Sequence, residues 1–210
     1  MLSPEKALIF RITHVNNVPW ILENGLHCSS SGQSDPNYVA IGNAEIIDRR
    51  ATRIVPIAPG GTLADYVPFY FTPFSPMLLN IKTGKLGVVQ RPMSEIAILV
   101  SSLPKVKDLA IPFVFTERHA VLEAAEFHDS LDRLDRIDWP RLQNRDFKRD
   151  PDNPAKFERY QAEALVYQHV PSAAILGIIC QRQEEQTKIE SICGTLNIAA
   201  QVLCRPNWYF

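Results

Sequence analysis

The chain has 210 residues, of which 46% are hydrophobic and 21% are charged, and its formal net charge is -1. These values are typical of a globular protein and exclude a disordered or strongly basic chain, so any contact with nucleic acid must come from a local patch. The length predicts one domain, residues 1–210. The four cysteines form no CxxC pair, which argues against a zinc site and predicts reduced thiols.

The first fourteen residues, MLSPEKALIFRITH, interrupt a short apolar run with charges, which argues against a signal peptide. No apolar stretch of the sequence approaches the length that crosses a membrane. We therefore expect a cytoplasmic protein without membrane contact.

The first quarter of the chain predicts a strand, a helix, a loop and a second helix. Residues 7–13 (ALIFRIT) have strand composition, and residues 16–22 predict a helix with Pro19 near its start and Gly25 at its end. The Ser, Gly, Asp and Pro content of residues 27–38 predicts a loop, and residues 43–52 have helical propensity.

Residues 66–77, YVPFYFTPFSPM, combine five aromatic residues with three prolines. Because proline cannot donate to a β-ladder, the segment is expected at a sheet edge, a bulge or a turn. Aromatic rings that line a cleft offer a stacking surface to a nucleobase or a nicotinamide. The alternative is an ordinary core strand at a sheet edge.

The rest of the chain predicts short strands and one long helix. Strands are expected at residues 96–101, 112–116, 162–167, 174–180 and 201–204, a helix at 183–198, mixed helical spacing at 123–138 and a charged loop at 144–156. Without a regular βαβ alternation this order favours an α+β fold. The sequence contains neither GxGxxG nor a Walker A loop.

Three side chains are candidates for chemistry. Glu163 interrupts an apolar strand, and a carboxylate fixed in a cleft can stabilise a cationic sugar. Arg50, the second of a pair, is able to clamp a diphosphate through two hydrogen bonds. A solvated surface position is the alternative for both, and a lone histidine such as His119 is more often structural.

Six blocks taken together strongly resemble the DarT family, the DNA ADP-ribosyltransferase toxins of DarTG toxin-antitoxin systems. In chain order they are RITHVNNVPWILENGL, IIDRRATRIVP, PGGTLADYVPFYFTPFSPML, PFVFTERHAVL, YQAEALVY and RPNWYF. The resemblance implies an α+β ADP-ribosyltransferase fold with a central split β-sheet flanked by helices. It also implies a toxin that transfers ADP-ribose from NAD to a base in single-stranded DNA, with thymidine as the first candidate.

NAD is then a co-substrate, no metal is needed, and the implied partners are single-stranded DNA and a DarG-type macrodomain antitoxin. Guanosine, RNA or protein remain alternative acceptors. A catalytically silent nucleic-acid-binding domain remains the alternative from another class.

The same match implies roles for individual residues. Glu163, Arg50 and His119 match catalytic positions, and residues 33–52 are expected to cover the bound NAD. The residues implied in NAD binding are Arg11, Ile12, Thr13, His14, Asn17 and Arg50. Those implied in DNA binding are Phe74, Ser75, Pro76, Met77, Leu78, Leu79, Arg145, Lys148, Arg149 and Lys156.

The sequence departs from the family pattern at three of these blocks. Arg11 stands where a histidine is common, Phe74 where an arginine is common and Ala164 where a phenylalanine is common. The change at Phe74 removes a cation from the expected DNA face, so base preference is expected to differ from that of relatives with arginine there.

Overall fold

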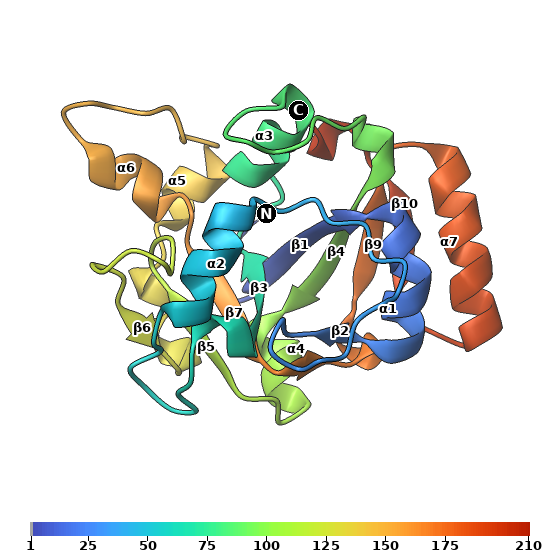
Figure 1. The fold of residues 1–210 in the computed structure, drawn as a ribbon, viewed down its shortest axis with the longest axis horizontal. Helices are drawn as coiled ribbons and strands as arrows, with labels where there is room; N and C mark the ends of the chain where they lie inside the picture. Colours follow the sequence, from blue (N-terminus) through green and yellow to red (C-terminus); the bar gives the residue numbers. More distant parts are fainter. Residues whose placement is uncertain (1) are drawn as a thin grey trace.

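A computed structural model describes residues 2–210 as a large sheet with helices on both of its faces (Figure 1). The helices and strands are β1 (Leu8–His14), α1 (Val18–Asn24), β2 (Leu26–His27), α2 (Ala44–Thr52), β3 (Tyr66–Tyr70), α3 (Pro76–Thr83), β4 (Ile96–Ser102), α4 (Leu103–Asp108), β5 (Phe113–Thr116), β6 (Phe127–His128), α5 (Trp139–Gln143), α6 (Pro154–Arg159), β7 (Glu163–Tyr167), β8 (His169–Val170), β9 (Gly177–Cys180), α7 (Gln183–Leu196) and β10 (Gln201–Cys204).

The large sheet is divided near its middle. Its strand order is β10-β9-β4-β1-β3-β7-β5-β6. β1 pairs with β4 along its whole length, and β3 pairs with β7 along its whole length. Between β1 and β3, in contrast, the only registered pair in the described chain is Phe10 with Tyr70. The two halves of the sheet therefore meet at one end and separate beyond it, which confirms the expected split sheet.

The first half of the aromatic segment does not lie at a sheet edge, so the expected edge position is wrong there, whereas residues 71–74 form the expected kind of turn before α3. β3 is a central strand, and Pro68 pairs in register with Leu165 of β7. A proline is tolerated because Pro68 faces the opening between β3 and β1. There the guanidinium Nη1 of Arg11 donates to the Pro68 carbonyl oxygen over 2.9 Å. Phe69 and Phe71 are fully buried, so the alternative of a core strand holds for this half of the segment.

The hydrophobic core lies on both faces of the sheet. Ala97 and Leu99 of β4 pack on the face covered by α1 and α7, whereas the alternate residues Ile96 and Ile98 pack on the face covered by α3 (Figure 1). Alternation of this kind follows from the two-residue period of a strand. Because both faces are covered, β4 is apolar along most of its length.

Most of the expected elements are present, but the middle of the chain differs. Residues 123–138 form β6 and a 3-10 helix, Leu131–Arg136, in place of a regular α-helix. The pairing of β6 with β5 competes with helix formation there. In addition, α3 begins at Pro76, where only a turn was expected.

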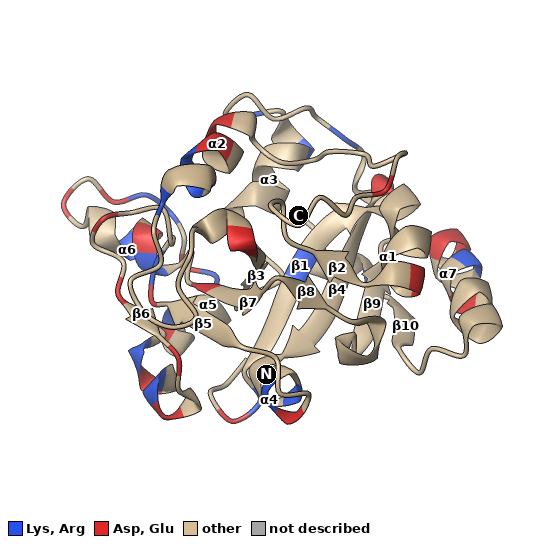
Figure 2. Ribbon diagram, turned by 60° about the horizontal axis from the view of Figure 1, so that its bottom comes forward, with Lys and Arg blue, Asp and Glu red and all other residues tan. Residues whose placement is uncertain are grey.

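Charged residues lie mainly on helices and loops (Figure 2). β1 is an exception, because its single cationic residue, Arg11, forms a blue band in the middle of a sheet that is otherwise mostly tan. Within residues 2–210, none of the helices combines the length and the apolar character that crossing a membrane requires.

Candidate active site

Glu163 occupies the centre of the half-sheet that β3, β7 and β5 form. It is the first residue of β7 and lies in register between Tyr70 of β3 and Thr116 of β5. Its side chain is only 3% exposed. A buried carboxylate is costly unless it is paired and hydrogen-bonded, so its partners define the site.

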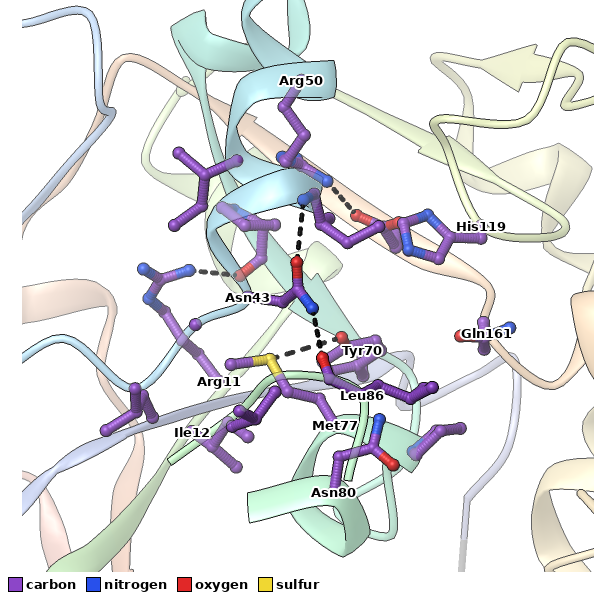
Figure 3. Close-up of a pocket in the computed structure, with 18 of the residues that line it drawn as sticks. Arg11, Ile12, Asn43, Arg50, Tyr70, Met77, Asn80, Leu86, His119 and Gln161 are labelled. Atoms are coloured by element: carbon purple, nitrogen blue, oxygen red, sulfur yellow. Dashed lines mark hydrogen bonds and ion pairs between the residues drawn. The ribbon is translucent and has the colours of Figure 1, made fainter. Parts of the chain in front are cut away.

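Three groups hold the Glu163 carboxylate, and two of them, Arg50 and His119, are labelled in Figure 3. Arg50 donates from Nη1 to Oε2 over 2.8 Å. The backbone N–H of Ala120 donates to Oε1 over 3.0 Å, and His119 Nδ1 lies 2.9 Å from the same oxygen. The structure thus brings together the three side chains that the sequence suggested as catalytic, from α2, from the loop after β5 and from β7.

These contacts decide the protonation state of Glu163. Burial by itself raises the pKa of a carboxyl group. The positive charges of Arg50 and His119, together with hydrogen bonds from His119 and the Ala120 N–H, outweigh burial and lower the pKa of Glu163 to about 2. Glu163 is therefore an anion at neutral pH.

The lowered pKa predicts a dependence of stability on acid. The ordinary pKa of a glutamate is 4.5, so the Glu163 contacts contribute fully to the free energy of unfolding above about pH 4.5 and are lost as the pH falls toward 2. We expect this free energy to fall more steeply between pH 4.5 and 2 in the wild type than in Glu163→Gln, measured by urea unfolding. Parallel curves for the two proteins would contradict the assignment.

Helix α2 carries Arg50 over the opening of the sheet, and none of its residues is fully buried. Asn43 caps its start, where Oδ1 accepts from the Ile46 N–H and Nδ2 donates to the Leu86 carbonyl over 2.6 Å. Just beyond its end, Arg53 donates to the Leu122 carbonyl over 3.0 Å. Polar contacts, more than packing, therefore hold α2 in place.

Two cavities meet beneath α2, one of about 570 Å³ and one of about 420 Å³. We call them the larger and the smaller chamber. The larger chamber contains Glu163 and His119, and the smaller contains Thr13 and Asn17. The residues that line both chambers are Arg11, Tyr38, Ile47, Arg50 and Pro68.

The boundary between the chambers holds unused hydrogen-bond donors. Nε of Arg11 and Nη2 of Arg50 are buried, and neither has a hydrogen-bond partner among residues 2–210. Buried polar atoms without partners are uncommon in folded proteins. Both guanidinium groups are thus suited to receive an anionic or carbonyl oxygen of a ligand at this boundary.

Asn17 fixes the loop that covers the boundary. Its Nδ2 donates to the Val39 carbonyl over 3.0 Å, and its Oδ1 accepts from the Val39 N–H over 2.8 Å. A second donation from Nδ2 reaches Thr13 Oγ1 over 3.2 Å. The amide is fully engaged, so Asn17 acts on a ligand by positioning the segment that contains Tyr38.

If NAD is the ligand, as the resemblance implies, replacing Asn17 by alanine is expected to raise KM for NAD about 10-fold, because each lost hydrogen bond costs about 1 kcal/mol and the covering loop loses its anchor. The turnover number should change less than KM. Initial rates at varied NAD concentration test this, with Asn16→Ala as the control, since Asn16 is exposed and lies outside both chambers. Equal KM values for wild type and Asn17→Ala would contradict the anchoring role.

Two of the residues implied in NAD binding have other surroundings. His14 lies outside both chambers; its Nδ1 accepts from the Asn16 N–H, and its Nε2 lies 3.4 Å from Glu95. The His14 side chain thus points to other partners, and a contact of His14 with NAD stays a prediction. Ile12 borders the larger chamber but belongs mainly to the core beneath α3.

The residues around α3 divide between the core and the larger chamber. Ser75 is buried and caps the helix by accepting from the Leu78 N–H, and Leu78 is fully buried. Neither residue lines a chamber, and their expected contacts with DNA stay predictions. Pro76, Met77 and Asn80 line the larger chamber. Met77 and Asn80 share one helix face because they are three residues apart.

Phe74 is also buried, but a cation covers it. The guanidinium of Arg145 lies 3.4 Å from the centre of the Phe74 ring, and the ring of Phe210 packs at its edge. Stacking of this kind is favourable for arginine. The positive charge that the sequence lacks at position 74 is thus supplied from the charged loop.

The expected basic DNA face is reduced by internal ion pairs. Lys156 lies 2.6 Å from Asp146, so its charge is partly neutralised. Arg145, Lys148 and Arg149 are exposed, and of these three only Arg149 lines the larger chamber. Leu79 is half-buried and lies outside both chambers.

Sequence reasoning did not single out Gln161, and it included Tyr38 and Tyr70 only as members of longer segments. Tyr70 was visible only as part of the aromatic segment, because its place opposite Glu163 depends on the register of two distant strands. Among the described residues, 2–210, no group of three or more His, Cys, Asp or Glu side chains is arranged to hold a metal ion.

Comparison with known proteins connects this geometry to a family. Residues 10–210 match the family model described as "ssDNA thymidine ADP-ribosyltransferase, DarT". A DNA ADP-ribosyl transferase of Escherichia coli O127:H6 is 54% identical over 209 residues, which cover 100% of this chain and 96% of that protein. A DNA ADP-ribosyl transferase of Thermus sp. (strain 2.9) is 39% identical, over 99% of this chain and 98% of that protein.

Solved structures give the same result. The fold is similar to that of Thermus sp. 2.9 DarT in complex with ADP-ribosylated ssDNA, with a TM-score of 0.89 and 37% identity over 100% of this chain and 99% of that chain. It is also similar to the same DarT in complex with NAD+, with a TM-score of 0.85 and 36% identity over 99% of this chain and 100% of that chain. The expected ADP-ribosyltransferase fold is therefore confirmed.

Proposed function

The chain belongs to the DarT family of single-stranded-DNA thymidine ADP-ribosyltransferases, and from this we propose that it transfers ADP-ribose from NAD to thymidine in single-stranded DNA. The observation that carries the proposal is the Glu163 carboxylate in the larger chamber, held by His119 and by Arg50, which also lines the smaller chamber. No second function is favoured by a comparable observation.

The reaction exchanges one glycosidic bond for another. The bond between C1 of the nicotinamide ribose and the nicotinamide nitrogen breaks, and its electron pair leaves with neutral nicotinamide. N1 of thymidine is already bonded to deoxyribose, so N3 is the ring nitrogen that bonds to the same carbon. The N3 proton is released. The products are ADP-ribosylated DNA, nicotinamide and one proton.

The two chambers provide separate places for the two substrates. NAD lies in the smaller chamber, where Thr13 and the loop anchored by Asn17 surround its nicotinamide ribose. The acceptor base enters the larger chamber, beside Glu163, Met77 and Arg149. The reacting carbon then lies at the shared boundary, next to Arg50.

Glu163 and Arg50 act on opposite charges. The Glu163 carboxylate stabilises the positive charge that develops on the ribose as nicotinamide leaves, because a fixed anion in a low-dielectric site interacts strongly with a nearby cation. Arg50 stabilises the negative charge that develops on thymine as N3 loses its proton. An arginine stays protonated under these conditions, so it acts by its charge and not as a proton acceptor.

The decisive experiment incubates the protein with NAD and single-stranded oligonucleotides that contain all four bases, lack T or lack G. We expect a mass increase of one ADP-ribose only when T is present, with release of an equal amount of nicotinamide. Adducts on the oligonucleotide without T would redirect the proposal to another base, and no adduct on any oligonucleotide would refute DNA modification.

We also propose that a DarG-type macrodomain antitoxin counteracts this enzyme in the cytoplasm of the cell that makes it. This partner is implied by the family. Treatment of the modified oligonucleotide with such a macrodomain should restore the unmodified mass, and persistence of the adduct would argue against this pairing.

A further inference from the structure

Tyr70 places a hydroxyl group in the larger chamber without a strong partner. The residue lies directly opposite Glu163 in the pairing of β3 with β7. Its side chain lines the larger chamber together with Met77 and Gln161, and Figure 3 shows the hydroxyl pointing toward the Met77 sulfur. That sulfur, 3.8 Å away, is its only hydrogen-bond partner within residues 2–210. A thioether is a weak acceptor, so the hydroxyl is available to a ligand.

Building on the proposed function, we infer that Tyr70 contacts the acceptor base and donates a hydrogen bond to one of the two carbonyl oxygens beside the attacking nitrogen. When thymine loses its N3 proton, the negative charge spreads onto O2 and O4. A donor aimed at either oxygen therefore binds the transition state more tightly than the ground state, which is the requirement for acceleration.

The surroundings of Tyr70 suit this role. Burial, with a further contribution from the Glu163 charge, raises the pKa of the Tyr70 phenol, so the group remains a donor at neutral pH. Arg50 approaches the base from α2 and Tyr70 from the floor of the chamber, so the two donors are supplied by different elements. Tyr70 thereby joins Arg50 in stabilising the thymine anion.

The same contact contributes to base selection. Thymine has a carbonyl on each side of N3, and guanine has one carbonyl beside N1. Adenine has none beside its N1, and cytosine N3 has no proton to lose. A hydrogen bond that strengthens with developing oxygen charge therefore favours thymine and guanine over the other two bases.

Replacing Tyr70 by phenylalanine tests the inference, because only the hydroxyl is removed. We expect the rate of DNA modification to fall about 10- to 100-fold, as for loss of a hydrogen bond to a charged group. KM for NAD should remain near that of the wild type. Tyr167→Phe is the matched control, since Tyr167 lies at the other end of the same strand pair and lines neither chamber.

Substituted oligonucleotides identify the contact itself. In 2-thiothymidine and 4-thiothymidine one carbonyl oxygen becomes sulfur, a weaker acceptor. The effect of sulfur on N3 acidity is the same for both enzymes, so it cancels in the ratio of wild-type to Tyr70→Phe rates. We expect this ratio to fall toward one with one of the two analogues and to stay high with the other.

The inference would be overturned by wild-type rates for Tyr70→Phe with unmodified thymidine, or by an equal rate ratio for thymidine and both analogues. A loss of thermal stability in Tyr70→Phe that matches its loss of activity would also overturn it. Absence of any adduct with the wild type would instead refute the proposed function, so the two failures are distinguishable.

Discussion

Glu163→Gln is expected to lower the rate of ADP-ribose transfer about 10²- to 10³-fold, as for removal of one preorganised electrostatic contact. Glutamine preserves the size of the side chain and can still accept the Ala120 N–H, so the geometry changes little. What it loses is the negative charge. That charge has its full effect only when the ribose becomes cationic, and kcat should therefore fall more than KM for NAD rises.

The substitution also leaves the Arg50 guanidinium without its counterion, with a cost in stability of about 1–3 kcal/mol. Thermal unfolding of the variant measures this cost and shows whether the protein remains folded at the assay temperature. Mass spectrometry of a thymidine oligonucleotide after incubation with NAD measures the activity. Glu184→Gln is the control, because Glu184 pairs with Lys188 on the surface of α7. Activity of folded Glu163→Gln within a factor of ten of the wild type would refute the assigned role.

Local patterns predicted the elements that are determined by neighbouring residues. Gly25 ends α1 as predicted, the expected helix at residues 43–52 agrees with α2, and the apolar composition of β4 predicted a strand. Glu163 was recognised as a candidate because a charged residue within an apolar strand is unusual. These inferences needed no knowledge of distant contacts.

Features that depend on distant parts of the chain were inaccessible to the same reasoning. The central position of β3 depends on Arg11, whose guanidinium donates to the Pro68 carbonyl where a neighbouring strand would otherwise donate. The anchoring role of Asn17 depends on Val39, twenty-two positions away. Arg145 covers Phe74 only because the charged loop folds back onto α3. In each case a single long-range contact changes the role of a residue.

Arg50→Ala is expected to abolish most DNA modification, with a loss of about 10²- to 10³-fold. The Arg50 side chain lies in both chambers, and its free Nη2 is the donor available to the acceptor base. Arg50→Lys should retain an intermediate rate, because lysine keeps the charge but loses the second N–H of the planar fork. This ranking distinguishes a role for the charge from a role in proton acceptance, in which lysine, the more readily deprotonated group, would equal or exceed arginine.

Arg49→Ala is the matched control for this series, since Arg49 is the adjacent residue on α2 but is exposed and lines neither chamber. Removal of Arg49 should leave the rate near that of the wild type. This result would show that the rate depends on the place of Arg50 in the chambers and not simply on the positive charge of α2. Because Arg50 also lines the smaller chamber, KM for NAD is measured beside the rate of transfer, so that weaker NAD binding is separated from slower reaction with the base. Near-normal DNA modification by Arg50→Ala, or an equal loss with Arg49→Ala, would show that the acceptor base does not depend on this guanidinium.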